Sequence, residues 1–231
     1  MKKYIILIIM IIAAIIIGIF SVNNAPSVVA EPNNQSDDTI EIVDYITTDE
    51  NGTEYVCGIP REFVSTQTIN PIITNGTQSF VFDRNLKYKD IPYDYEEDID
   101  ILVLQPKTTQ IVIKYGIGGI PQEMCVRAKN YTNTNKAIKE CNVVDLRFYA
   151  GWQWDVFGIN FAMTPDEVKS ILGEPYNEII AEDPVFEESH SLIYYLEHND
   201  CLYYICVTYG DGKMFDIVVN LNNEPITSQA E

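Results

Sequence analysis

Basic residues are scarce in this chain. Its 231 residues contain 15 Lys and Arg against 34 Asp and Glu, which gives a formal net charge of −19. Nucleic-acid binding requires clustered Lys and Arg to neutralise phosphates, and anionic lipid attracts the same residues. The composition therefore excludes a nucleic-acid-binding surface and electrostatic attraction to an anionic membrane. Five cysteines are also too few for a miniprotein built on disulfides.

Recognisable catalytic and metal-binding motifs are lacking as well. There is no nucleophile-elbow, Walker-type or dinucleotide-binding run. His190 and His198 lie near Cys201 and Cys206, but their spacing matches no zinc signature, so no metal is expected. We predict that the chain is not an enzyme and takes no cofactor. A thiol-dependent enzyme is the remaining alternative, although the apolar neighbours of Cys206 indicate a buried, inert thiol.

The N-terminus carries the signature of export. Met1-Lys2-Lys3 precedes an apolar run from Tyr4 to Phe20, the order found in signal peptides and signal anchors. At 1.5 Å per residue the run reaches about 25 Å, slightly less than the ~30 Å bilayer core. We therefore expect residues 1–22 to form a single-pass anchor, with residues 4–22 in the membrane and the rest facing outside. Cleavage after Ala30 is the alternative, and it would secrete the protein.

The chain beyond the anchor divides by composition. Residues 23–39 are rich in Asn, Ser, Pro and Asp, which is typical of a flexible linker. From residue 40 to residue 150, short β-like runs alternate with turn signals such as Asn51-Gly52 and Asn75-Gly76. This spacing predicts an antiparallel sheet. A short helix is expected over residues 60–65, with Pro60 in its first turn.

A second unit is predicted over residues 156–223, followed by a tail at 224–231. Thr164 and Glu167 form a capping box around Pro165, and Gly173 ends the helix. Strands are expected at Leu192–Glu197, Cys201–Tyr209 and Met214–Leu221, with a tight turn at residues 210–212. A helix on an antiparallel sheet defines an α+β fold. The expected fold class is thus α+β, with two small tandem domains, 40–150 and 156–223.

Residues 158–175, GINFAMTPDEVKSILGEP, resemble the G-M-T-x-x-E-V-x-x-x-L-G-x-P helix of a known superfamily. That superfamily contains β-lactamase inhibitory protein and the BamE/SmpA/OmlA lipoproteins. The first unit is similar, over residues 57–60 and 126–144, to a companion domain in surface proteins of Gram-positive anaerobes. These resemblances imply two α+β binding or scaffold modules of the cell envelope and no reaction. Inhibition of a secreted hydrolase is an alternative function.

Two further features concern covalent and ionic links. Cys125 and Cys141 lie symmetrically about Asn133, where a hairpin would turn, so a cross-strand disulfide between them is geometrically allowed. The acidic run from Asp90 to Asp100 lacks the glycine and the distant glutamate of an EF-hand loop. We interpret it as a solvated loop, with weak calcium binding as the alternative.

Tyrosines give the best functional clue. Tyr194 and Tyr195 lie in one expected strand, and Tyr203 and Tyr204 lie in the next. Because adjacent residues of a strand point to opposite faces, each face receives some of them. Tyrosines on the buried face belong to the core, whereas those on the other face form a patch suited to protein recognition. We therefore expect an extracytoplasmic protein as the partner, bound through an exposed Tyr-rich sheet face.

Overall fold

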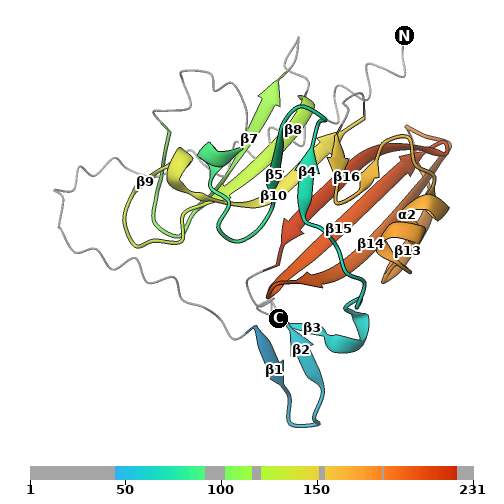
Figure 1. Ribbon diagram of the computed structural model, residues 1–231, viewed down its shortest axis with the longest axis horizontal. Helices are drawn as coiled ribbons and strands as arrows, with labels where there is room; N and C mark the ends of the chain where they lie inside the picture. The colour runs from blue at the N-terminus through green and yellow to red at the C-terminus, as the bar shows by residue number, and fades with distance from the viewer. Residues whose placement is uncertain (1–44, 92–101, 116–120, 151–153, 184, 223–231) are drawn as a thin grey trace.

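A computed structural model describes residues 45–91, 102–115, 121–150, 154–183 and 185–222 (Figure 1). The predicted anchor at 1–22, the linker at 23–39 and the tail at 224–231 lie outside these ranges. Among the residues that the structure describes, no helix has the length and apolar composition that a membrane crossing requires.

A seven-stranded antiparallel sheet dominates the structure (Figure 1). From one edge to the other its strands are β13 (Asn177–Glu182), β14 (Glu188–His198), β15 (Cys201–Gly210), β16 (Lys213–Leu221), β10 (Asn142–Tyr149), β8 (Pro121–Lys129) and β7 (Thr109–Tyr115). The three strands predicted between residues 192 and 221 are confirmed as β14, β15 and β16. Asp211 and Gly212, both at positive φ, form the two-residue turn between β15 and β16, as expected for an Asp-Gly hairpin.

The predicted α+β class with two tandem domains is wrong. Strand β10 pairs with β16 from Asp145↔Asn220 to Tyr149↔Asp216, so one sheet combines strands from both expected units. Residues 61–63, expected to be helical, form only a 3-10 turn, η1 (Arg61–Phe63). The described residues contain one α-helix, and the fold is mainly β. The error arose because local periodicity identifies strands but does not indicate which distant strands pair.

The one described helix follows its prediction closely. Helix α2 (Pro165–Leu172) begins at Thr164, whose amide donates to Glu167 Oε2 at 2.8 Å, and Glu167 N donates back to Thr164 Oγ1 at 3.4 Å. This reciprocal pair is the capping box. Gly173 ends the helix at φ 84°, a conformation that glycine adopts at low cost. Val168 and Leu172 are buried in the core.

Three small sheets and two more short turns complete the described fold. The first sheet contains β1 (Ile46–Thr48), β2 (Glu54–Val56) and β3 (Ile59–Pro60). The second contains β4 (Ile72–Thr74), β5 (Ser79–Val81), β11 (Asp155–Val156) and β12 (Ile159–Asn160), and the third contains β6 (Val103–Leu104) and β9 (Lys136–Ala137). The turns are η2 (Tyr88–Asp90) and η5 (Ile138–Glu140).

The main core lies on one face of the large sheet, which we call the core face. Tyr194 of β14 and Tyr203 of β15 are buried there with the apolar residues of β4, β5 and α2. Tyr203 donates its hydroxyl hydrogen to the Phe82 carbonyl at 2.8 Å, and this hydrogen bond links β15 to the residue that follows β5. Side chains alternate across a strand, so the residues between these buried positions form a second face. In β14 and β15 most of their side chains are only partly buried, with Leu202 an exception, and we call this second side the open face.

Candidate functional site

The open face runs across the whole large sheet. In β13, β14, β15 and β16, cross-strand register places Ile179, Ile193, Tyr195, Tyr204, Cys206 and Val218 on it. From β16 to β8 it also carries Asp216, Asn220, Asp145, Arg147, Tyr149, Cys125 and Arg127. One end of the face is therefore aromatic and aliphatic, and the other is charged.

The four predicted tyrosines divide evenly between the two faces. Tyr194 and Tyr203 are fully buried on the core face, where they serve packing. Tyr195 and Tyr204 are cross-strand partners on the open face, with ring centroids 5.7 Å apart. Such a pair of directly opposed aromatic rings stabilises a sheet and presents a stiff surface.

Two aromatic residues that the sequence did not indicate extend this pair into a row. The Tyr176 ring lies 5.3 Å from the Tyr195 ring, and the Phe63 ring lies 5.0 Å from the Tyr176 ring. Phe63 and Tyr176 are 40% and 47% exposed. We call Phe63, Tyr176, Tyr195 and Tyr204 the aromatic row. Its members come from three distant segments, so no local pattern could have joined them.

Burial affects the two central phenols of the row. It raises the pKa of Tyr195, with a smaller contribution from Tyr176, and it raises the pKa of Tyr204, where nearby Cys206 adds to the effect. Both hydroxyls therefore stay protonated at neutral pH. Each offers a neutral hydrogen-bond donor beside an apolar ring, which suits contact with another protein.

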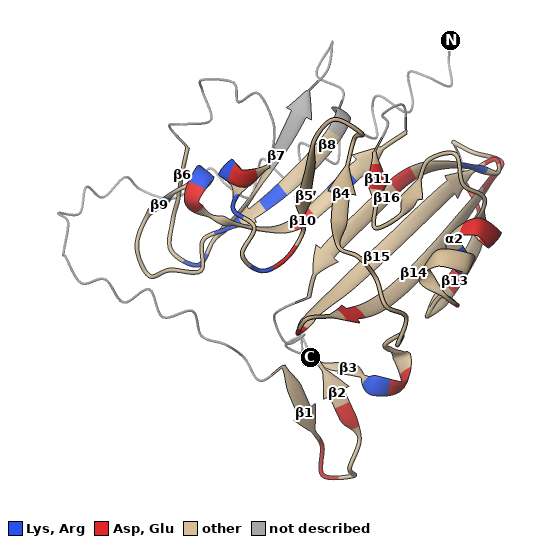
Figure 2. Ribbon diagram, in the orientation of Figure 1, with Lys and Arg blue, Asp and Glu red and all other residues tan. Residues whose placement is uncertain are grey.

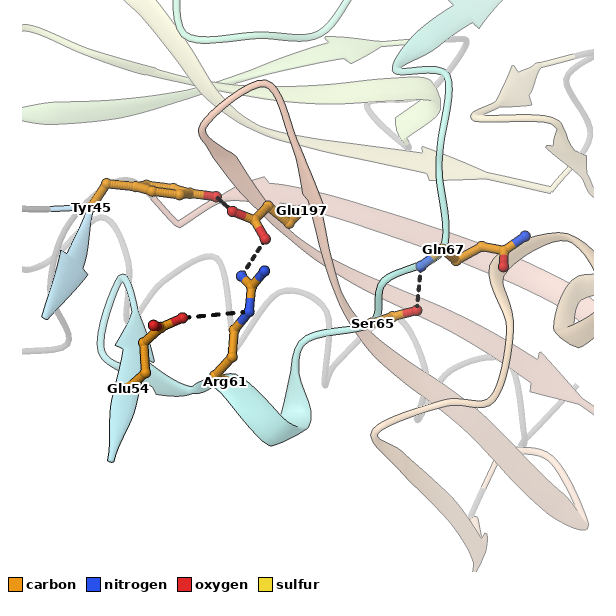
Figure 3. Close-up of polar contacts among 6 residues, drawn as sticks. All are labelled: Tyr45, Glu54, Arg61, Ser65, Gln67 and Glu197. Atoms are coloured by element: carbon orange, nitrogen blue, oxygen red, sulfur yellow. Dashed lines mark hydrogen bonds and ion pairs between the residues drawn. The ribbon is translucent and has the colours of Figure 1, made fainter. Parts of the chain in front are cut away.

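The small sheet of β1 to β3 covers the part of the open face next to the aromatic row. Glu197 accepts a hydrogen bond from the Tyr45 hydroxyl at 2.9 Å and forms an ion pair with Arg61 (Figure 3). Arg61 also lies 3.7 Å from Glu54. Beneath these polar groups, Leu202 packs in a second buried cluster with Val56, Cys57, Ile59 and Val64.

The segment after η1 runs along the edge of β14 beyond Ile193, which pairs with the first residue of β13. Ser65 N donates to the Tyr195 carbonyl at 2.8 Å, and Ser65 forms a parallel bridge with Leu196. Ser65 Oγ in turn accepts a hydrogen bond from Gln67 N at 3.1 Å (Figure 3). These contacts fix the backbone two residues after Phe63, so they hold that ring against Tyr176.

The charged end of the open face is an internally satisfied network. Arg147 donates to both oxygens of Asp216, at 2.9 Å from Nε and 2.6 Å from Nη2. Asn220 Nδ2 donates to Asp145 Oδ2 at 3.2 Å. Burial raises the pKa of both carboxyls, and the neighbouring arginines oppose that rise. Asp216 and Asp145 therefore each have a hydrogen-bond partner at this end of the face.

Three of the five cysteines have thiol pKa values raised by burial. Burial raises the pKa of Cys57 to about 11 and raises the pKa of Cys125 and Cys141. These thiols therefore stay protonated at neutral pH and are weak nucleophiles. Cys201 is buried, and Cys206 Sγ lies 3.7 Å from Thr208 Oγ1.

The structure does not bring Cys125 and Cys141 together. All five cysteines are free thiols, and Cys125 lies opposite Arg147 in the β8–β10 pair. This register centres the connection on residue 136 rather than on Asn133, because β9 and η5 lie within it. Cys141 therefore lies beyond the end of the paired strands. Its Sγ contacts the Ala137 carbonyl at 3.4 Å.

Of the residues considered for metal binding, only His198 and Cys201 are neighbours, as cross-strand partners in the β14–β15 hairpin, whereas His190 and Cys206 pair with Tyr209 and Ile193. His190 Nε2 lies 2.7 Å from Glu178 Oε1, and His198 Nε2 lies 2.9 Å from Asn199 Nδ2. Within the described ranges no three His, Cys, Asp or Glu side chains gather as a metal would require. Of the acidic run considered for calcium, only Asp90 and Ile91 are described, and the remainder lies outside the described residues.

A cavity of about 330 Å³ lies between the β4–β5 region and the turn that joins β14 to β15. Its lining includes Asp83, Arg84, His198 and Asp200. The Arg84 guanidinium lies 5.5 Å from the centre of the Tyr45 ring. The lining combines two carboxylates with a cation and an imidazole, so its charge selects no one class of ligand.

Comparison of the chain with protein-family models, with curated proteins and with solved structures finds no match. The resemblance of residues 158–175 to the superfamily of β-lactamase inhibitory protein and the BamE lipoproteins therefore stays a prediction. The function has to be argued from the geometry of the open face.

Proposed function

We propose that the chain is a non-enzymatic protein-binding module of the cell envelope, and that the aromatic row is its recognition surface. The observation that supports this proposal is the row itself. Its four rings follow one another with centroids 5.0 to 5.7 Å apart, on a partly exposed sheet face. Aromatic side chains are enriched at the centres of protein interfaces, because they bury a large area at low entropic cost.

The surroundings of the row also favour binding over catalysis. At one side the row is fixed by the Arg61–Glu197 ion pair and the Ser65–Tyr195 hydrogen bond. At the other side Cys206 and Val218 continue an apolar surface. A rigid, pre-formed aromatic patch loses little entropy when a partner docks. The export signature of the N-terminus supports a partner outside the cytoplasm.

Site-specific photo-crosslinking on intact cells tests the proposal. A benzoylphenylalanine at position 176 should capture a defined partner, because Tyr176 is an exposed member of the row. The same probe at position 81 is the control, since Val81 is equally exposed but lies in β5. Mass spectrometry of the product would distinguish an envelope component from a secreted hydrolase that the chain inhibits.

A variant of the aromatic row gives a second test of the proposal. We expect Tyr195→Ala with Tyr204→Ala to lower the crosslink yield from position 176 by about fivefold or more, the scale of interface hot spots. Thr208→Ala, on the open face of β15 away from the row, should leave the yield unchanged. Equal yields from the double variant and from Thr208→Ala would refute the proposal.

A further inference from the structure

Among the strands that the structure describes, β13 is an edge of the large sheet, and none of them pairs with its outer side. Among the described residues its neighbour is β14, which pairs with all six of its residues from Asn177↔Ile193 to Glu182↔Glu188. All six β13 residues are exposed, and Ile179 and Ile180 are 45% and 61% exposed on opposite faces. An edge strand with exposed apolar side chains is a template for pairing with another strand.

Acidic side chains outnumber basic ones around this edge. Glu178 and Glu182 lie in β13 on the same face as Ile180, and Glu187 and Glu188 follow at the start of β14 (Figure 2). The nearest cation, Lys169 of α2, already donates to Glu178 Oε2 at 2.8 Å. The edge thus combines apolar contact area with acidic side chains that flank it.

These charges argue against a second copy of the chain as the occupant. Antiparallel pairing of two β13 strands about Ile180 would place Glu178 opposite Glu182 twice. Like charges directly opposite each other destabilise a strand pair. Basic side chains at the same two positions would instead meet both glutamates.

We propose that the outer edge of β13 binds an extended segment of a partner protein as an eighth strand, with basic residues flanking apolar ones. Main-chain hydrogen bonds would supply affinity, and alternate side chains would supply specificity. On the face of Glu178, Ile180 and Glu182, the added strand would place a basic residue beside each glutamate and an apolar residue beside Ile180. On the open face it places apolar residues beside Ile179 and Ala181. Side-chain periodicity therefore gives the five-residue pattern basic–apolar–apolar–apolar–basic.

This inference rests on the proposed function, because it names the chemistry of the partner segment. Tyr176 of the aromatic row immediately precedes β13, and Ile179 lies on the same open face as Tyr195. A partner strand on β13 would therefore bring the rest of that partner over the row. The strand edge and the row nevertheless consist of different residues, so each can be tested separately.

The probe is a fluorescein-labelled ten-residue peptide with Lys-Val-Ile-Val-Lys at its centre, titrated into the full chain in detergent micelles. Fluorescence anisotropy should show saturable binding that weakens as salt is added. The matched peptide with Glu in place of both Lys residues should bind about tenfold more weakly, because two attractions become repulsions. Equal binding of the two peptides would overturn the proposal, as would no saturable binding of the Lys peptide.

Variants of the protein localise the peptide. Ile180→Lys adds a cation to the exposed centre of β13, and we expect about tenfold weaker binding of the Lys peptide. Ile111→Lys is the matched control, since Ile111 is 54% exposed on the opposite edge strand, β7. Circular dichroism would verify that both variants fold. An equal loss of binding in both variants, or a dimer that Ile180→Lys dissociates, would overturn the assignment.

The two proposals fail in different ways. If the Lys peptide does not bind but Tyr195→Ala with Tyr204→Ala abolishes partner capture, the strand inference falls and the aromatic row stands. If the peptide binds β13 but the row variant captures its partner at full yield, the aromatic row falls instead.

Discussion

At the residue scale, the packing around Gly210 leaves no room for a side chain at this position. Gly210 ends β15, and the Phe186 ring packs directly over it. A Cβ atom at this position would lie 2.5 Å from two carbons of that ring. Phe186 has little freedom to withdraw, because its ring also stacks on Phe215 at a centroid distance of 4.8 Å.

Gly210→Ala should therefore lower the free energy of unfolding by roughly 1–3 kcal/mol, the cost of overpacking. Urea denaturation measures this change. Phe186→Ala removes the obstructing ring, so Gly210→Ala should cost much less in that background. A full loss of stability in both backgrounds would show that the clash with Phe186 is not the cause.

A second residue-scale effect concerns the buried carboxyl of Asp216. Burial raises its pKa, although the bidentate contact with Arg147 opposes the rise. The folded state therefore holds this proton more tightly than the unfolded state does. Above the unfolded pKa, which is about 4 for aspartate, the contribution of Asp216 to stability falls as pH rises through the folded pKa.

Asp216→Asn removes this titration. From pH 4 upward we expect the stability difference between variant and wild type to shift in favour of the variant, whatever its value at pH 4. Urea unfolding at pH 4, 5, 6 and 7 gives the difference. A constant difference would mean that the carboxyl has the same pKa in both states, and a shift in favour of wild type would mean that its folded pKa is lowered.

At the scale of elements, the small β1–β3 sheet is attached to the large sheet by few contacts. Its polar anchor is Glu197, held by Arg61 and Tyr45, and its apolar anchor is the cluster around Leu202. Cys57 lies in the β2–β3 turn and is buried in that cluster. The reactivity of this thiol therefore reports whether the small sheet is docked.

Arg61→Met keeps the aliphatic stem of the side chain but removes the ion pair. Because partly exposed ion pairs contribute up to about 1 kcal/mol, alkylation of Cys57 should become about two- to fivefold faster. Mass spectrometry would follow the modification at Cys57 by itself. Lys89→Met removes the Lys89–Glu140 pair elsewhere, so it should leave the rate unchanged. Equal rates in wild type and Arg61→Met would contradict the role of the ion pair.

Elements with strong local signals could be predicted from the sequence, whereas their pairing could not. The capping box and Gly173 located α2, and apolar alternation with an Asp-Gly turn located β15 and β16. Strand β13 was missed. The aromatic row was only half predicted, because Phe63 and Tyr176 reach it through contacts between distant segments.

At the scale of the whole molecule, the β10–β16 pair decides how the chain unfolds. The pair joins a strand of residues 142–149 to one of residues 213–221 through five residue pairs. Leu146, Phe148, Ile217 and Val219 are buried where these strands meet, within the main core. Because the two expected units share one sheet and one core, we expect them to unfold in a single cooperative transition.

Hydrogen exchange measures this coupling. Val219→Ala removes two methyl groups from the shared core and should destabilise the fold by about 1–3 kcal/mol. The free energies of exchange should then fall by equal amounts for amides in β8 and in β14, which lie on opposite sides of the β10–β16 pair. Two independent domains would instead lose protection in β14 while β8 kept its own. Unequal losses would therefore show that the sheet, although continuous, consists of two separately stable parts.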